Sequence, residues 1–312
     1  MRHLFILNPV SGGMNDKEGL IRTINEAAAR HGAQAEIYET VGPMDAAEKV
    51  KREAIKGQEL RVYACGGDGT LSECVHGAAG YHNVAVTHFP TGTGNDFIKS
   101  FPGDTELFRN LDELLEGTAL PLDVIDVNGR KCIDIASVGI DARVGTDVHK
   151  YSSLPLIGGK GAYITSLVVN IFKGINRPFT FTTEEAEYTG KFALCCACNG
   201  RFYGNGFNPT TTALPDDGLL DILIVKKVGL IKLAALLGDY SKGDYAKHPD
   251  TIIPVRGRKL RITSEEEFVV NIDGEAMFTK DCQMKLIPGG VNFIMPASSA
   301  FLKERIAAAA GA

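Results

Sequence analysis

Glycines and an aspartate follow a buried-looking strand in the first third of the chain. The segment Leu60–Cys65 has the composition of a strand, and Gly66-Gly67-Asp68-Gly69-Thr70 separates it from a helical pattern at Leu71–Ala78. Helix N-terminal amides bind phosphate, and glycine lets phosphate approach the backbone closely. Asp68 would repel phosphate unless a cation stood between them. The pattern therefore predicts a phosphate site with Mg²⁺ beside Asp68; the alternative is an ordinary glycine-rich turn.

Two further turns carry polar residues after strands. Phe89–Phe97 reads FPTGTGNDF, in which Asn95 and Asp96 suit both ligand contact and helix capping, so an N-cap role for Asp96 stays open. Asn8–Gly13 reads NPVSGG and follows the first strand, although such residues mark any tight turn. Because ligands bind outside the carboxyl ends of parallel strands, we expect these turns to converge on one crevice.

A pair of carboxylates lies far downstream. Asn271-Ile272-Asp273-Gly274-Glu275 places Asp273 and Glu275 at the end of a strand. The alternative is an Asp-Gly hairpin turn without a chemical role.

The element pattern divides the chain in two. Up to about residue 125, short apolar runs alternate with helical patterns, at about 17–31 and 44–56 among others, as in α/β units around a parallel sheet. After Asp123 the pattern becomes β-rich, typical of an antiparallel sandwich or barrel, with expected strands that include 131–137, 269–272 and 283–287 and helices at 161–172 and 230–240. We expect an α/β domain over 1–125, a β-sandwich domain over 126–290, and a C-terminal segment, 291–312, that packs back on the first domain.

Composition excludes some classes of protein. The net charge of −5 and the pI near 5.8 argue against a nucleic-acid partner. The seven cysteines match no zinc spacing and are interpreted as reduced thiols in the core. No apolar run reaches the length of a signal peptide core or a membrane span, so we expect a cytoplasmic protein that contacts the membrane only peripherally.

The motifs NPVSGG, GGDGT, PTGTGNDF and NIDGE, in this order, resemble the diacylglycerol kinase catalytic family, which includes bacterial lipid kinases, sphingosine kinases and ceramide kinases. The resemblance runs from Asn8 to Glu275. It implies a Rossmann-like, three-layer ATP-binding domain, similar to that of NAD kinases, followed by a β-sandwich lipid-substrate domain. It also implies Mg²⁺-assisted transfer of the γ-phosphate of ATP to a lipid hydroxyl, most simply that of a diacylglycerol.

The same resemblance implies the roles of individual residues. Glu275 would accept the hydroxyl proton, with Asp273 as its rival, and Asp68 and Asp96 would place Mg²⁺ and the phosphates. An accessory metal would take Leu214, Asp217 and Leu219, with Asp123 linking it to the active site. The residues lining ATP would be Asn8, Pro9, Val10, Ser11, Gly12, Thr40, Gly66, Gly67, Asp68, Gly69, Thr70, Leu71, Ser72, Thr93 and Asn95. Ser72 departs from the asparagine usual in relatives, and Lys99 from the usual arginine.

The lipid acceptor implies a partner surface, the inner face of the membrane. Gly161–Lys173 carries apolar residues at helical spacing between lysines, although an ordinary core helix fits them too. The basic run from Arg256 to Arg261 alternates between strand faces, which favours a solvated edge. A homodimer and the identity of the lipid stay open. Two alternative functions are a kinase of a soluble metabolite such as NAD and a nucleotide-binding regulator without turnover.

Overall fold

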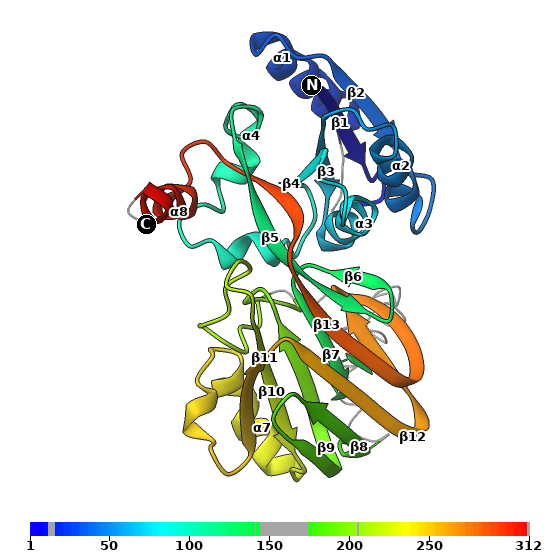
Figure 1. Cartoon of the computed structure of the whole chain (residues 1–312), viewed down its shortest axis with the longest axis vertical. Helices are drawn as coiled ribbons and strands as arrows, with labels where there is room; N and C mark the ends of the chain where they lie inside the picture. Colours follow the sequence, from blue (N-terminus) through cyan, green and yellow to red (C-terminus); the bar gives the residue numbers. More distant parts are fainter. Residues whose placement is uncertain (12–15, 141, 144–173, 205, 311–312) are drawn as a thin grey trace. The chain divides into compact units, whose positions relative to one another are not determined.

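The computed structural model describes residues 1–11, 16–140, 142–143, 174–204 and 206–310. The chain forms two compact units (Figure 1). Unit 1 comprises Met1–Val124 together with Pro288–Ala312, and unit 2 comprises Ile125–Ile287. Unit 1 is therefore built from two separate stretches of sequence.

A parallel sheet forms the centre of unit 1. Its strands β1 (Arg2–Leu7), β2 (Ala35–Glu39), β3 (Leu60–Gly66) and β4 (Val84–Pro90) lie in the order β4-β3-β1-β2. The helices α1 (Lys17–Arg30), α2 (Asp45–Ala54) and α3 (Asp68–Ala78) connect them. The inner strands β1 and β3 are almost entirely buried, which explains their continuous apolar sequences.

The strand order decides which face each helix covers. Parallel crossovers are right-handed, so α1 must cover one face of the sheet and α2 and α3 the other. The close packing of α2 on α3 agrees with this arrangement. The chain leaves β1 and β3, which are neighbours, toward opposite faces, and such a position is where α/β sheets bind ligands. The predicted α/β fold class is confirmed.

The end of the chain completes unit 1. The last residues of β13 (Glu275–Met295) add to the sheet beside β4, and α8 (Ala300–Ala310) follows. Phe293 packs against Phe97 and Phe101, with ring centroids 5.4 and 6.2 Å apart, and Phe301 lies 4.9 Å from Phe101. The Asp104 carboxylate accepts hydrogen bonds from the Ser299 hydroxyl and from the first amides of α8. Three short helices precede β5 in unit 1: η1 (Phe97–Ser100), η2 (Leu107–Arg109) and α4 (Leu111–Leu115).

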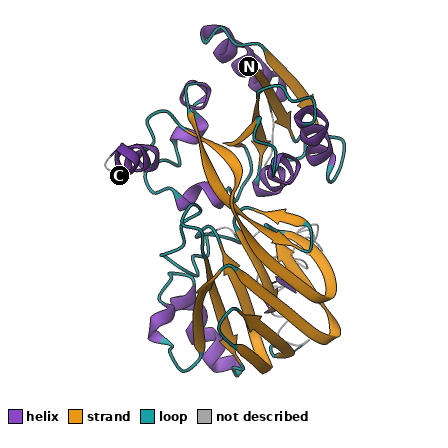
Figure 2. Ribbon diagram, viewed as in Figure 1, coloured by secondary structure: helices purple, strands orange, loops and turns teal. Residues whose placement is uncertain are grey.

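Unit 2 is built mainly of antiparallel strands (Figure 2). Pairs join β9 (Glu187–Cys198) to β10 (Leu220–Lys226) and to β7 (Ile135–Gly139), and β12 (Lys259–Ile272) to β13 and to β7. Strand β5 (Thr118–Val127) begins in unit 1 and ends in unit 2, and the other strands of unit 2 are β6 (Arg130–Cys132), β8 (Arg177–Thr183) and β11 (Ile252–Gly257). Helix α7 (Leu230–Tyr240) and the short η3 (Tyr245–Lys247) lie between β10 and β11. The predicted β-rich second half is confirmed.

Several expected boundaries were wrong. The strand expected at 131–137 is split into β6 and β7, because the amides of residues 133–135 bond a carboxylate instead of a neighbouring strand. Helix α3 begins at Asp68, so part of the expected loop is its first turn. The sequence analysis missed β5 and β11, and the strand expected at 283–287 is part of the much longer β13. The helix expected at 161–172 lies outside the described residues.

All seven cysteines are free and buried, as predicted. Those in unit 2 belong to apolar clusters on the two faces of its central strands, for example Cys195 on one face and Cys196 on the other. Burial raises the pKa of the Cys282 thiol to about 12, which keeps it protonated and unreactive.

Candidate active site

The N-terminus of α3 has no side-chain cap. Its N-cap is Gly67, which has no side chain to bond the first amides, and the first intrahelical bond runs from the Leu71 amide to the Gly67 carbonyl. The residues before Leu71 in the helix are Asp68, Gly69 and Thr70. A helix presents the amides of its first turn, with the positive end of its dipole, to phosphate.

The Gly66 carbonyl fastens the two glycine-rich segments together. It accepts hydrogen bonds from the Thr91 amide (2.9 Å), the Gly92 amide (3.1 Å) and His88 Nε2 (3.0 Å). The backbones also touch, because a Cβ on Gly92 would lie only 2.4 Å from the Gly67 Cα. Glycine at position 92 is therefore required by close contact between the segments.

His88 is a site residue that the sequence analysis missed. It is fully buried in β4, and burial lowers its pKa to about 4, so the imidazole is neutral near neutral pH. Since a carbonyl oxygen can only accept, Nε2 carries the proton, and the buried Nδ1 has no hydrogen-bond partner among the described residues. A histidine inside a largely apolar strand, just before a glycine-rich turn, was the available signal.

Asp68 and Asp96 lie together. Asp68 Oδ1 accepts the Asp96 amide at 2.6 Å, and Asp96 Oδ1 accepts Lys99 Nζ at 2.6 Å. Asp96 occupies the N-cap position of the short helix that follows, but its side chain makes no capping bond to that helix. A Cβ on Gly94 would lie 2.6 Å from Asp68 Oδ2 and 3.8 Å from Asp96 Oδ2, so both oxygens face one point. Such oxygen donors fit a hard cation such as Mg²⁺.

The turn after β1 joins this site through Asn8. Its Nδ2 donates to Thr70 Oγ1 at 3.1 Å, and its Oδ1 accepts the Val10 amide. The Thr40 amide bonds the Leu7 carbonyl, which brings the end of β2 beside the end of β1. Gly12 lies outside the described residues.

The remaining residues predicted to line ATP differ in exposure. Pro9, Val10 and Thr93 are exposed, whereas Ser11, Leu71 and Ser72 are buried. Asn95 has a positive φ of 51° and donates to the Gly92 carbonyl, while its buried Oδ1 has no partner within the part of the chain that the structure describes. Asn95 thus offers an unused acceptor within the second glycine-rich segment.

Asp273 and Gly274 form the hairpin turn between β12 and β13. Both have positive φ, 49° and 97°, as a type I′ turn requires, so these residues do form an Asp-Gly hairpin turn, and the role of Glu275 remains a prediction. The Asp273 carboxylate accepts hydrogen bonds from the amides of Ile133 (2.9 Å), Asp134 (3.0 Å) and Ile135 (3.2 Å), and from the Cys132 thiol. The Asp273 carboxylate therefore stabilises the position of this turn against residues 132–135.

Glu275 is the first residue of β13 and is exposed. Within the described ranges it forms no hydrogen bond or ion pair with another side chain. The turn thus presents one carboxylate of the pair to solvent and uses the other for structure, a division that the sequence left open.

Asp217 lies beside an arginine rather than in an acidic cluster. Its Oδ2 accepts Arg256 Nη2 at 2.6 Å and its Oδ1 accepts the Leu219 amide, while Arg256 Nε lies 3.1 Å from Asp221 Oδ1. Burial raises the pKa of Asp221. A cation held by Asp217 with the Leu214 and Leu219 carbonyls would compete with the Arg256 guanidinium. The described residues contain no cluster of three or more acidic, His or Cys side chains suited to a metal.

Asp123 is nearly fully buried and accepts the Gly289 amide at 2.8 Å. This bond joins β5 to the segment of β13 that belongs to unit 1. The predicted link from Asp123 to a metal remains a prediction.

A parallel sheet with an uncapped helix N-terminus and two acidic residues beside it is an arrangement at which α/β units bind phosphate groups. The diacylglycerol kinase catalytic domain matches residues 2–127, and the YegS C-terminal domain, described as NAD kinase beta sandwich-like, matches residues 134–295. The chain belongs to the diacylglycerol kinase catalytic family. It is accordingly an enzyme of the lipid kinase class, a phosphotransferase.

Individual relatives agree with this placement. A diacylglycerol kinase of Staphylococcus carnosus is 27% identical over 278 residues, which cover 88% of each chain. A protein of Shewanella frigidimarina, named "Probable lipid kinase YegS-like", is 27% identical over 255 residues, 78% of this chain and 79% of its own. The crystal structure of a diacylglycerol kinase from Bacillus anthracis superposes with a TM-score of 0.69 at 23% identity, over 96% of this chain and 98% of the other, and shows the same fold.

Proposed function

We propose that this protein transfers the γ-phosphate of ATP to the hydroxyl of a diacylglycerol-like lipid, with Glu275 as the general base. The nucleotide half of the proposal rests on one observation. Hydrogen bonds to the Gly66 carbonyl hold the two glycine-rich segments together beside the uncapped N-terminus of α3. The lipid half rests on the family and on the exposure of Glu275.

Each group has a separate task in the reaction. The amides at the start of α3 bind phosphate oxygens, and Asn8 holds Thr70 in the first turn of that helix. The lipid hydroxyl oxygen attacks the γ-phosphorus while the bond from that phosphorus to the β,γ-bridging oxygen breaks, and ADP leaves. Glu275 accepts the hydroxyl proton as the new P–O bond forms.

Mg²⁺ would be held by Asp68 and Asp96 and would offset the charge of the phosphates. Lys99 keeps the Asp96 carboxylate oriented through its ion pair. An accessory cation at Leu214, Asp217 and Leu219 belongs to the proposal on the family resemblance alone. The proposed place of action is the inner face of the cytoplasmic membrane, where ATP and the lipid meet.

The Glu275→Gln variant tests the base. We expect phosphate transfer to fall at least about a hundredfold, because general-base catalysis contributes roughly 10²–10⁴ in rate. Affinity for ATP, measured by calorimetry, should not change, because Glu275 lies outside unit 1. Turnover close to that of the wild type would refute the assignment.

A transfer screen tests the acceptor. Purified protein, Mg²⁺ and γ-labelled ATP would be combined with micelles of diacylglycerol, monoacylglycerol, sphingosine or ceramide, and with NAD as the soluble acceptor. Label should appear in one of the lipids. Transfer to NAD alone would replace the proposal with the metabolite-kinase alternative, and ATP binding without any transfer would favour the regulator.

A further inference from the structure

Helix α7 leaves two large apolar side chains in solvent. Leu233, Leu236 and Tyr240 are buried in the apolar cluster against β9 and β10. In contrast, Leu230 is 54% exposed and Ile231 is 89% exposed. These two residues open the helix and extend away from the cluster that holds its other face. Adjacent exposed aliphatic side chains at a helix end suit insertion into an apolar medium.

Lysines surround this apolar pair. Lys226 ends β10, Lys227 follows it, Lys232 follows Ile231, and all three are exposed. No acidic residue occurs from position 226 to position 238. In the part of unit 2 that the structure describes, these lysines form no ion pair, whereas Arg256, Arg261 and Lys247 each pair with an aspartate.

The described acidic groups near this end of β10 lie on other elements. Asp250 is exposed beside Thr251, whose carbonyl accepts the Lys226 amide. Glu266 of β12 is paired with Arg177, the first residue of β8, and the exposed Glu265 and Glu267 flank it in β12. The segment from position 226 to position 238 thus carries three lysines and no acidic residue, although the whole chain carries −5.

The turn that carries the pair is held rigidly. Asn176 Nδ2 donates to the Val228 carbonyl at 2.8 Å, and Asn176 Oδ1 accepts the Val228 amide at 2.9 Å. Val228 itself is buried. The side chains on either side of it are thus presented from a fixed backbone, which lowers the entropic cost of binding a partner.

We propose that Lys226, Lys227, Leu230, Ile231 and Lys232, the α7 patch, dock this protein on an anionic lipid surface. Leu230 and Ile231 enter the acyl boundary, and the lysines contact the anionic headgroups. The basic run at 256–261 does not compete for this role, since Arg256 and Arg261 are paired with carboxylates and Arg258 bonds the Gly218 carbonyl. The proposal rests on the proposed function in that the acceptor lies in a bilayer, but docking itself requires no ATP.

The test is co-sedimentation without nucleotide. Wild-type protein would be mixed with vesicles of phosphatidylcholine alone or of phosphatidylcholine with phosphatidylglycerol, at low and at high salt. The apolar variant is Leu230→Ser with Ile231→Ser, and the charge variant replaces Lys226, Lys227 and Lys232 by Gln. We expect the wild type to bind the anionic vesicles, and to bind them more weakly at high salt. The vesicle affinity of each variant should be at least about tenfold lower than that of the wild type.

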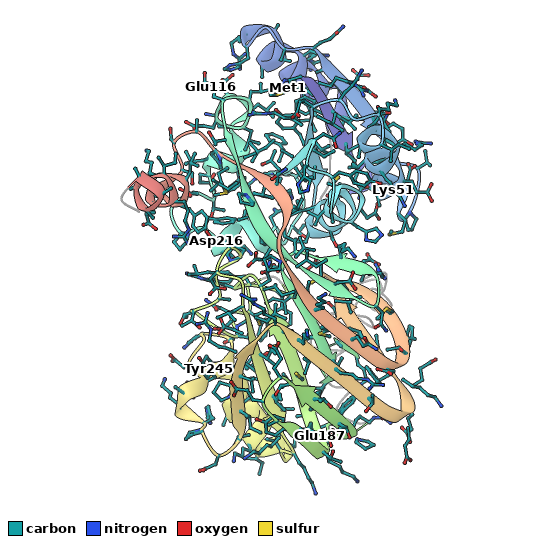
Figure 3. The ribbon with its side chains drawn as sticks, in the orientation of Figure 1. Met1, Lys51, Glu116, Glu187, Asp216 and Tyr245 are labelled. Carbon is teal, nitrogen blue, oxygen red and sulfur yellow. The ribbon has the colours of Figure 1, made fainter. Side chains whose placement is uncertain are left out.

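Matched controls change other exposed groups of the same kinds. Ile55→Ser replaces an isoleucine that is 66% exposed in unit 1. The second control replaces Lys51, Lys259 and Lys285 by Gln, which removes the same amount of charge from other parts of the surface. Lys51, on α2, is labelled in Figure 3. Both controls should bind vesicles as the wild type does, and thermal unfolding should show all variants folded.

Several outcomes would overturn the proposal: no binding of the wild type to anionic vesicles, equal binding to both vesicle types, or equal losses in the controls. A dimer that the Ile231 substitution dissociates would assign the patch to a second copy of the chain instead. Phosphorylation of lipid in detergent micelles reports separately on the proposed function. Micellar activity without vesicle binding refutes the docking surface alone, and vesicle binding without any transfer refutes the kinase proposal alone.

Discussion

At the residue scale, His88 shows how a buried polar group can position a ligand site that it does not reach. Its Nε2 donates to the Gly66 carbonyl from within β4, and the same carbonyl receives the amides of Thr91 and Gly92. The imidazole is the only side chain among these donors. The orientation of the first glycine-rich segment thus depends partly on a residue outside every recognised motif.

We expect His88→Leu to weaken ATP binding about fivefold, the equivalent of about 1 kcal/mol for one lost hydrogen bond. His88→Gln keeps an N–H donor at similar reach and should restore most of the affinity. The KM for ATP should rise more than kcat falls. Calorimetry and steady-state kinetics would measure both; equal ATP affinity in the Leu and Gln variants would contradict the positioning role.

Gly92→Ala tests the contact between the glycine-rich segments. The added Cβ would meet the Gly67 Cα at 2.4 Å, and backbone cannot turn aside as a side chain can. We expect ATP affinity to fall at least about tenfold, with about 1–3 kcal/mol lost in the free energy of unfolding. The control is Gly238→Ala in α7, where a Cβ meets nothing within 4 Å. Unchanged ATP binding in Gly92→Ala would show that the segments can separate without consequence.

At the element scale, an ion-pair network joins α2 to the edge of the sheet. Glu53, on α2, is nearly buried and contacts Arg2 of β1 and both Lys49 and Lys56, while Glu36 of β2 contacts Arg2 and Lys49. Burial alone would raise the pKa of Glu53, but hydrogen bonds from Lys56, Lys49 and Arg2 outweigh it and lower the pKa to about 2.

This network predicts a pH dependence of stability. Because the pKa of Glu53 is lower in the folded state, its contribution is complete above the unfolded value of about 4.5 and is lost as the pH falls toward 2. Urea unfolding of the wild type should show this loss. The Glu53→Gln variant should be less stable at neutral pH, and its difference from the wild type should shrink below about pH 4. A difference independent of pH would exclude Glu53 as the cause.

The sequence predicted those elements whose partners lie close along the chain. The phosphate segment at Gly66–Thr70 is recognisable because a strand, glycines and a helix follow one another directly. The division of roles between Asp273 and Glu275 was not predictable, because it depends on amides about 140 positions earlier. Strand β5 was missed because Pro121 and the change of texture near Asp123 interrupt its pattern. The role of His88 could not be predicted either, because its hydrogen-bond partner, the Gly66 carbonyl, lies on the neighbouring strand β3.

At the scale of the whole molecule, unit 1 is incomplete without the end of the chain. Phe293 fills the space between Phe97, Phe101 and Phe108, and Thr87 Oγ1 donates to the Ile294 carbonyl. We therefore expect a fragment of residues 1–124 to be unfolded or molten, because it exposes this aromatic cluster and the edge of β4.

A permuted chain, in which residues 288–312 are linked ahead of residues 1–124, should restore a cooperative thermal transition and ATP binding. Near-UV circular dichroism and calorimetry would compare the two. A well-folded fragment 1–124 that binds ATP would contradict the requirement for the C-terminal segment.

Strand β13 begins in unit 2 and ends in unit 1, and this affects the order in which the protein folds during synthesis. A ribosome releases residues 1–124 and then all of unit 2 before Asn292 and Phe293 can pair with β4. We expect unit 2 to fold first, although it is encoded second, and the nascent chain to acquire nucleotide affinity only at the end of synthesis. Phosphate transfer would then be confined to finished molecules by the order of folding alone.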